Sequence, residues 1–323
     1  MIFRKLTKAE IIEIYQNRMP CDFAPGEIKP LSRILELWRM EKYFCYGLFT
    51  GKQGENPQTA AGYCFLVASN QRDAVLLDYF AVLDKERGKG CGSKCFSLLK
   101  KEIQKEKLGT LILEVENPRF GEDVQDISIR RRRIHFYRRN GMTLTHLRIF
   151  LYDVEYLVMT AKPQELFQSA EQIYHVYEVL LKPDKLKTKL RITANIRGIM
   201  LKEGIAGKNE RIAQKLAKLE KLGVYVDCGE KLKQDLISGE RENISEKPDI
   251  NPEEWIVFGD SDSDAAVLER AGIGIVPENA SFSAKNAANY LIEAHDDCKI
   301  RNVLEEILQI LIECSLAPDS LTD

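Results

Sequence analysis

The stretch that decides the fold of the first half reads Tyr79-Phe80-Ala81-Val82-Leu83-Asp84-Lys85-Glu86-Arg87-Gly88-Lys89-Gly90-Cys91-Gly92-Ser93. Its apolar residues predict the end of a buried strand, its glycines predict a turn, and residues 92–105 predict an amphipathic helix. Backbone N–H groups at the start of a helix have no partner within the helix and attract anions, helped by the helix dipole. Glycine has no Cβ, so a phosphate can approach the backbone closely. The stretch therefore predicts a phosphate-binding loop.

The spacing of the glycines separates this loop from two common phosphate motifs. It fits neither the G-x-x-x-x-G-K-[ST] pattern of P-loops nor the G-x-G-x-x-G pattern of dinucleotide-binding folds. Arg87, Gly90 and Gly92 instead form the pattern [RQ]-x-x-G-x-[GA]. This pattern resembles the coenzyme A loop of GNAT-type N-acetyltransferases. The alternative interpretation is a purely structural turn between a strand and a helix.

The order of the elements around the loop resembles that of the same family. The predicted elements are two helices and four strands, at residues 9–18, 32–41, 44–49, 60–68, 74–83 and 111–115. Further along, Ile134-His135-Phe136-Tyr137-Arg138-Arg139-Asn140-Gly141-Met142 resembles the family's FY-x-x-x-G-F segment. The resemblance covers residues 1–185. It implies a GNAT fold, which is a mixed, mostly antiparallel sheet with helices.

The resemblance also implies a site for acetyl-coenzyme A between two splayed strands. The loop amides would hold the pyrophosphate, the backbone of Val82 and Leu83 would hold the pantetheine, and an N–H near Val82 would polarise the thioester carbonyl. Tyr137 matches the tyrosine that gives a proton to the departing thiolate. The implied cofactor-binding residues are Val82, Leu83, Arg87, Gly88, Lys89, Gly90, Cys91, Gly92 and Ser93.

The attacking amine must be neutral, so a general base is expected on the two strands. Asp78, Glu114 and Glu116 are the candidates, and the sequence does not decide which of them acts. For each carboxylate the alternative is a surface or salt-bridged group. Together with Tyr137, the residues Glu116 and Asp78 form the predicted catalytic set.

A block of four arginines occupies residues 130–133. One interpretation is a patch that binds an acidic acceptor. The interpretation that we favour is a solvated helix face, since runs of charge usually lie in solvent. The expected partners are the nearby carboxylates Glu122, Asp123 and Asp126.

A polar, basic segment broken by Pro183 separates the two halves of the chain. We expect residues 182–189 to form a linker, because composition shifts there and proline interrupts regular structure. Residues 190–201 predict a strand, and the strands that alternate with helices from Leu190 onward favour a parallel sheet in a Rossmann-like domain. The predicted organisation is an acetyltransferase domain at 1–185, a second α/β domain at 186–314 and a flexible tail at 315–323.

A carboxylate motif follows a buried strand in the second half. Gly259, Asp260, Ser261 and Asp264 form a G-D-S-x-x-D pattern. It is similar to the metal-binding motif of haloacid dehalogenase-like phosphatases, and the resemblance covers residues 188–314. Two carboxylates at this spacing can serve Mg²⁺, so Asp260 and Asp264 are candidate metal ligands. Alternatively they cap and brace the turn.

The catalytic motif of that family is altered in this chain. The family's first strand ends in D-x-D-G-T, and the matching stretch places Asn195 at the nucleophile and Arg197 at the acid/base position. A carboxamide cannot form an aspartyl-phosphate intermediate. Residues 226–230 lack the expected Thr or Ser, Lys247 matches the phosphate-contacting lysine, and residues 231–246 are too few for a cap. The sequence predicts a capless domain without its catalytic Asp.

Composition bounds the class of protein. The 323 residues are 44% hydrophobic and 30% charged, with a net charge of −2, which excludes a disordered chain, a collagen-like chain and a membrane bundle. The lack of a basic excess argues against a nucleic-acid partner. Eight cysteines without a C-x-x-C pair, together with four histidines, argue against a zinc site. With no signal peptide recognised, we expect a cytoplasmic protein without a membrane partner.

These observations predict an acetyl-coenzyme A-dependent N-acetyltransferase. Its haloacid dehalogenase-like module would be catalytically inactive and serve binding, regulation or oligomerisation. The acceptor would be an amine on a small molecule or a peptide, and a homodimer is left open. One alternative is a phosphohydrolase with an accessory acetyltransferase domain. The other is a non-catalytic protein that senses coenzyme A.

Overall fold

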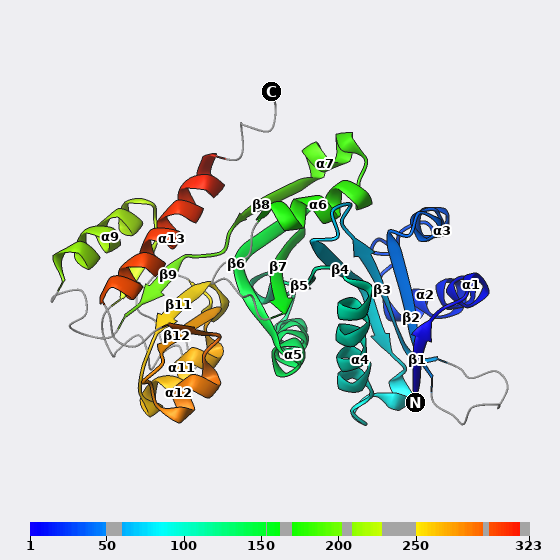
Figure 1. Ribbon diagram of the computed structural model, residues 1–323, viewed down its shortest axis with the longest axis horizontal. Helices are drawn as coiled ribbons and strands as arrows, with labels where there is room; N and C mark the ends of the chain where they lie inside the picture. Colours follow the sequence, from blue (N-terminus) through cyan, green and yellow to red (C-terminus); the bar gives the residue numbers. More distant parts are fainter. Residues whose placement is uncertain are drawn as a thin grey trace. The chain divides into compact units, whose positions relative to one another are not determined.

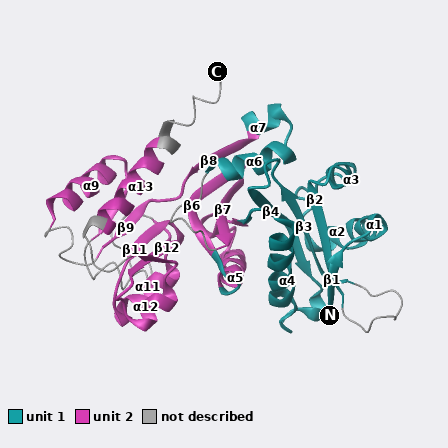
Figure 2. Ribbon diagram, in the orientation of Figure 1, with its two compact units in different colours: residues 1–114, 139–142, 169–188 teal, residues 115–138, 143–168, 189–323 magenta. Residues whose placement is uncertain are grey.

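The described part of the chain is an α/β protein with two sheets (Figure 1). The computed structural model describes residues 1–49, 60–152, 154–161, 170–201, 209–227, 250–292 and 297–316. The chain divides into two compact units (Figure 2). Unit 1 comprises Met1–Glu114, Arg139–Met142 and Ser169–Thr188, and unit 2 comprises Val115–Arg138, Thr143–Gln168 and Lys189–Asp323. Each unit therefore contains segments from several parts of the chain, and the predicted domain boundary at residue 185 stays a prediction.

Unit 1 contains a run of five neighbouring strands. They are β1 (Ile2–Lys5), β2 (Tyr43–Phe49), β3 (Ala60–Ala68), β4 (Ala74–Val82) and β5 (Thr110–Glu116), in that order, with the last two residues of β5 assigned to unit 2. Neighbours from β1 to β4 are antiparallel, whereas β4 and β5 are parallel. The prediction of a mixed, mostly antiparallel sheet is confirmed.

Several helices connect and cover these strands. They are α1 (Lys8–Asn17), α2 (Met19–Asp22), α3 (Leu31–Arg39), α4 (Cys91–Glu106), α6 (Ala170–Leu180) and α7 (Pro183–Lys189). Thr7 and Glu10 form a reciprocal capping box that starts α1. Both α4 and α6 contact β3 and β4, so the middle of the sheet is covered by helices.

Helix α7 occupies the segment that was expected to be a linker. The expected interruption of regular structure by Pro183 is wrong, because Pro183 stands at the first position of the helix, whereas the linking role of this segment stays a prediction. Proline is tolerated there, since its missing N–H has no partner in the first turn. The Thr188 hydroxyl donates to the Asp184 carbonyl oxygen at 2.8 Å within the same short helix.

Unit 2 begins with the end of β5, a 3-10 turn η2 (Pro118–Phe120) and α5 (Val124–Arg139), although the last residue of α5 and the first residue of β6 are assigned to unit 1. Three neighbouring strands follow in the order β7 (Val154–Ala161), β6 (Met142–Leu151) and β8 (Leu190–Ala194). The sequence predicted one strand across residues 190–201. The structure splits it into β8, which pairs antiparallel with β6, and β9 (Gly198–Met200), which belongs to a different sheet.

That second sheet has five strands. Its order is β10 (Tyr225–Asp227), β9, β11 (Trp255–Phe258), β12 (Ile273–Pro277) and β13 (Tyr290–Ile292), and each neighbouring pair is parallel. The predicted parallel sheet is therefore confirmed. A Cβ at Gly198 would lie 2.5 Å from the Trp255 side chain, so glycine is needed where β9 enters the sheet.

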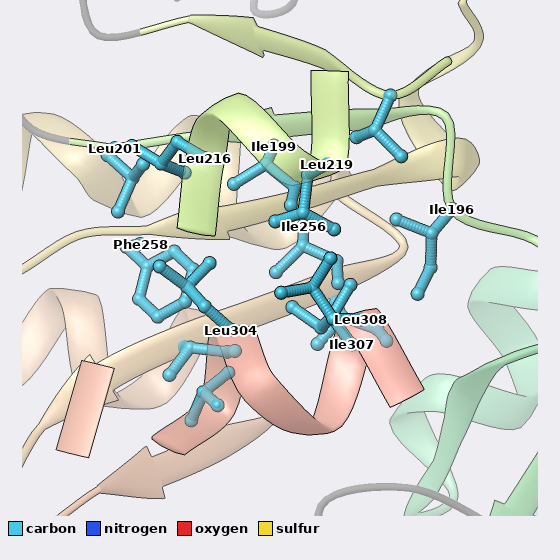
Figure 3. Packing of buried hydrophobic residues seen from close by; sticks show 14 of the residues in the cluster. Ile196, Ile199, Leu201, Leu216, Leu219, Ile256, Phe258, Leu304, Ile307 and Leu308 are labelled. Atoms are coloured by element: carbon cyan, nitrogen blue, oxygen red, sulfur yellow. The ribbon is translucent and has the colours of Figure 1, made fainter. Parts of the chain in front are cut away.

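Helices cover both faces of the parallel sheet. One core cluster joins the strands to α9 (Glu210–Lys221) and α13 (Asp297–Leu316) through residues such as Ile256, Leu216 and Leu304 (Figure 3). The other joins Trp255 and Val257 to α11 (Ala265–Arg270) and α12 (Phe282–Ala287). Successive residues of β11 thus alternate between the two clusters, as expected for a strand buried on both faces.

Candidate functional site

The predicted phosphate loop connects β4 to α4 through a short 3-10 turn, η1 (Asp84–Glu86). Gly88 and Gly90 have φ angles of +74° and +77°, which favour glycine, and an added Cβ at either would meet nothing within 4 Å. Gly90 is the N-cap of α4 without a side-chain cap, and the Lys94 N–H donates to its carbonyl oxygen at 3.0 Å. Among the described residues, no acceptor contacts the N–H groups of residues 91–93. The loop therefore presents open amides suited to an anion.

Arg87 secures the strand end that leads into this loop. Its Nε donates to the Val82 carbonyl oxygen at 3.1 Å, and its guanidinium lies 2.8 Å from the Asp84 carboxylate. The Leu83 N–H donates to the Ala61 carbonyl oxygen at 2.9 Å. Two backbone groups of the predicted pantetheine-binding segment are thus engaged within the protein, and its binding role stays a prediction.

The pairing of β4 with β5 ends inside unit 1, at Leu77 and Leu113, and we call this point the fork. Their parallel register runs from Ala74–Thr110 to Leu77–Leu113, although β4 continues to Val82. The next residue on each strand carries a carboxylate: Asp78 on β4 and Glu114 on β5. The register between β3 and β4 also shifts at this point, leaving Asp78 without an opposite residue. Such an irregularity re-aims a side chain and ends regular pairing.

Asp78 is held by two partners inside unit 1. Lys29 Nζ lies 2.6 Å from its Oδ1, and the Tyr43 hydroxyl donates to its Oδ2. The Asp78 side chain is 7% exposed. Burial alone would lower the pKa of Lys29, but the charges of Asp78 and Tyr79 hold it above the usual value. Asp78 therefore forms a buried ion pair, which orients the segment before α3.

The surroundings of Glu114 raise the pKa of its carboxyl group toward neutrality. Burial raises its pKa to about 7, and the Asp78 charge acts in the same direction. A hydrogen bond from the Tyr177 hydroxyl and the charge of Lys29 oppose this rise. Tyr177 lies on α6 and is 1% exposed. A carboxylate with a pKa near neutrality combines a substantial ionised fraction with useful basicity.

Glu116 is engaged in ion pairs within unit 2. Its carboxylate lies 2.9 Å from Arg133 and 3.4 Å from Arg130. Arg130 also lies 3.0 Å from Asp126, which is one of the three partners expected for a solvated helix face. Of the two candidate carboxylates on β5, Glu114 has the pKa raised toward neutrality, whereas Glu116 faces two cations.

Tyr137 lies on α5 in unit 2, whereas the loop and the fork belong to unit 1. Its side chain is 8% exposed and its ring lies edge-on to Phe136, with 5.2 Å between the centroids. The role that the resemblance assigns to Tyr137 stays a prediction.

The carboxylate motif of the second half forms a tight turn after β11. Asp264 Oδ2 accepts from the N–H groups of Asp260 and Ser261, both at 2.9 Å, and from the Ser261 hydroxyl at 2.6 Å. A Cβ at Gly259 would lie 2.7 Å from the Asp264 Cβ, so the turn is compact. Asp264 thus braces the turn. Within the described ranges, no three His, Cys, Asp or Glu side chains form a group that fits a metal ion.

The placement of Asn195 at the nucleophile position is wrong. Ligands of parallel α/β sheets bind at the carboxyl ends of the strands. Asn195 and Arg197 precede β9, whereas its carboxyl end is Met200, level with Val257. The Asn195 N–H donates to the His146 carbonyl oxygen, and its Nδ2 donates to the Glu253 carbonyl oxygen at 3.2 Å. Asn195 is therefore a buried connecting residue.

Residues 202–208, which follow that carboxyl end, lie outside the described residues, and they contain no Asp. Cys228, Lys247 and the expected site of the missing cap at 231–246 also lie outside them.

Three residues around the fork were missed by the sequence analysis: Lys29, Tyr43 and Tyr177. Lys29 and Tyr43 are 49 and 35 positions from Asp78, and Tyr177 is 63 positions from Glu114. Hydrophobic periodicity reports only which face of its own element a residue occupies. The one usable signal was the tyrosine in an otherwise apolar helix face, because a buried tyrosine hydroxyl usually finds a partner.

Two parts of the chain are similar to two different groups of known proteins. A family model of haloacid dehalogenase-like hydrolases matches residues 241–304. A phosphoglycolate phosphatase from Methanopyrus kandleri is 32% identical over 66 residues, which is 20% of this chain and 28% of that protein. The chain therefore spans little more than a quarter of the length of this curated relative.

Solved structures resemble the N-terminal half of the chain. A GNAT-family protein from Bacteroides thetaiotaomicron is 19% identical, with a TM-score of 0.41, over 54% of this chain and 92% of that one. An aminoglycoside 6'-N-acetyltransferase complexed with coenzyme A is 16% identical, with a TM-score of 0.37, over 51% and 99%. The chain joins a stretch similar to GNAT acetyltransferases to one similar to haloacid dehalogenase-like hydrolases. No helix in the described part of the chain has the length and apolarity to span a membrane.

Proposed function

We propose that this protein is an N-acetyltransferase that transfers the acetyl group of acetyl-coenzyme A to an amine. The observation that carries the proposal is the fork within unit 1. Glu114, with a pKa of about 7, stands where β4 and β5 stop pairing, and β4 leads directly into the amide-rich loop. The attacking amine needs a base, which the fork offers, and the pyrophosphate of the cofactor needs an anion site, which the loop at the strand end offers.

The proposed reaction forms a bond between the amine nitrogen and the acetyl carbon and breaks the thioester C–S bond. Acetyl-coenzyme A supplies the activated acetyl group. Glu114 takes the proton that the amine loses, and Tyr137 gives a proton to the departing thiolate. The loop amides hold the pyrophosphate, which orients the thioester and makes the attack effectively intramolecular. Asp78, bound to Lys29 and Tyr43, fixes the chain segment beside the base.

The acceptor that we propose is a primary amine on a small molecule or a peptide. A carboxylate with a pKa near 7 can accept a proton from a cationic ammonium group and so prepare the neutral nucleophile.

Isothermal titration with acetyl-coenzyme A tests the anion site. Gly90→Glu places a carboxylate at the N-terminus of α4, the end of the helix that favours anions. This carboxylate would repel the pyrophosphate and compete with it for the same amides, so binding should weaken about 10-fold or more. Gly223→Glu is the matched control: Gly223 also has a positive φ, +84° against +77°, with open space around an added Cβ. Binding should survive in the control. Absence of binding in the unmodified protein, or equal affinity in both variants, contradicts the proposal.

The haloacid dehalogenase-like module is proposed to lack phosphatase activity. Residues 202–208 follow the carboxyl end of β9 and contain no Asp that could form a phosphoenzyme. With Mg²⁺ and p-nitrophenyl phosphate, the unmodified protein and Asp260→Ala should show the same background rate. Hydrolysis that disappears in Asp260→Ala would favour a phosphohydrolase instead.

A further inference from the structure

An ion cluster around the buried carboxylate of Glu254 joins the start of unit 2 to the parallel sheet. Arg119, in η2, lies 3.0 Å from the Oε2 of Glu254, which is 1% exposed. Arg197 Nη1 lies 3.6 Å from the same oxygen, and the Asn251 N–H donates to it at 2.9 Å. Glu254 directly precedes β11. A carboxylate so deeply buried is stable only with such partners, so η2 and the sheet depend on each other.

Two arginines of α5 make further contacts with the same module. Arg138 Nη1 and Nη2 donate to the carbonyl oxygens of Glu269 and Ala271, both at 2.6 Å. These carbonyls belong to the C-terminal end of α11, where a cation is favoured. Arg131 Nε lies 3.7 Å from the carboxylate of Glu253.

These contacts gather at one edge of the parallel sheet. Arg197 and Glu254 directly precede β9 and β11, and Ala271 lies two residues before β12, so all three stand at the amino ends of strands. The turn beside them is tightly packed, because a Cβ at Gly272 would lie 2.2 Å from the Glu253 carbonyl oxygen. The opposite, carboxyl edge is where ligands of such sheets bind. The amino edge therefore serves a structural purpose.

We propose that the haloacid dehalogenase-like module is a brace that holds α5 and thereby positions Tyr137. Arg138 and Glu254 are the positioning residues, and Arg138 is the next residue after Tyr137 on α5. Unit 2 combines residues 115–138 with the whole module, in agreement with a shared packing unit (Figure 2). The positioning part of this inference rests on the proposed acetyl transfer, whereas the brace itself does not.

Hydrogen exchange of the full-length protein tests the brace. Arg138→Met should raise amide exchange in peptides of α5 about 10-fold or more, because an anchored helix opens less often. Arg138→Lys, which keeps the charge, should give an intermediate rate. Arg132→Met is the matched control, since Arg132 lies on the same helix and is exposed. Glu254→Gln provides a second variant that keeps side-chain shape. Unchanged α5 exchange in both Arg138→Met and Glu254→Gln overturns the brace.

Steady-state kinetics test the positioning of Tyr137. Arg138→Met should lower kcat about 10-fold to 100-fold with little change in the KM for acetyl-coenzyme A, because misplacement of a reacting group affects the chemical step. In a Tyr137→Phe background the same change should cost no further activity. Additive losses overturn the positioning role. If the unmodified protein transfers no acetyl group, the proposed function fails, and hydrogen exchange still decides on the brace.

Discussion

Glu114 is the residue whose protonation should control the proposed reaction. Burial raises its pKa to about 7, and a base must be deprotonated to act. We predict that kcat/KM falls as the pH drops below about 7 and levels off above it. Glu114→Gln should remove this limb and lower kcat/KM about 100-fold. Glu178→Gln, at an exposed position on α6, is the control and should keep the profile. A limb that persists in Glu114→Gln would assign the base elsewhere.

Tyr177 should tune that same limb. Its hydroxyl donates to the Glu114 carboxylate and lowers the pKa of Glu114, opposing the effect of burial. Tyr177→Phe removes this donor while keeping the ring in the core. We therefore predict that the acid limb of kcat/KM moves to higher pH, so that activity at pH 6.5 falls more than activity at pH 8.5. An acid limb that stays in place, or moves to lower pH, would show that this hydrogen bond does not govern the base.

Sequence reasoning at the residue scale could locate the loop glycines but could not choose between Glu114 and Glu116. The two residues stand two positions apart on one strand, so a period of two places them on the same side. What separates them is long-range: Tyr177 bonds one, and Arg133 pairs with the other at 2.9 Å. Such long-range contacts cannot be predicted from the local sequence pattern. A glycine in a turn can be predicted, because a positive φ favours glycine over other residues.

Helix α4 depends on the backbone at its N-cap. Gly90 has a φ of +77°, and an added Cβ would have open space around it, so the cost of Gly90→Ala lies in the backbone alone. We predict a loss of about 1–2 kcal/mol in the free energy of unfolding, measured by urea denaturation. Gly26→Ala is the control, because Gly26 also has open space but no positive φ. Equal stabilities of the two variants would contradict this account.

Most elements could be predicted from apolar periodicity and turn residues, but the division of residues 190–201 between two sheets could not. Residues 190–201 are strand-like in sequence, yet β8 and β9 enter different sheets. Pairing partners decide this, because β6 is available on one side and Trp255 occupies the space beside Gly198 on the other. Because the chain passes from one sheet to the other between β8 and β9, Asn195 lies in the connection before β9 and not at the carboxyl end of a strand, where the nucleophile was predicted. Strand content is a local property, whereas strand partnership is set by the whole chain.

At the scale of the molecule, residues 1–185 should not behave as an independent domain. In the full chain, β6 pairs with β8, whose residues Leu190–Ala194 lie beyond that boundary, and α5 is anchored by Arg138 to carbonyls of the second half. A fragment of residues 1–185 would expose the edge of β6 and leave Arg119 without Glu254. We predict that this fragment melts at least several degrees below the full chain or aggregates, as measured by calorimetry and gel filtration.

A chain ending at residue 316 keeps all these contacts and should melt like the full protein. A fragment of residues 1–185 that is monomeric and equally stable would show that the acetyltransferase-like half folds without the module that we propose as its brace.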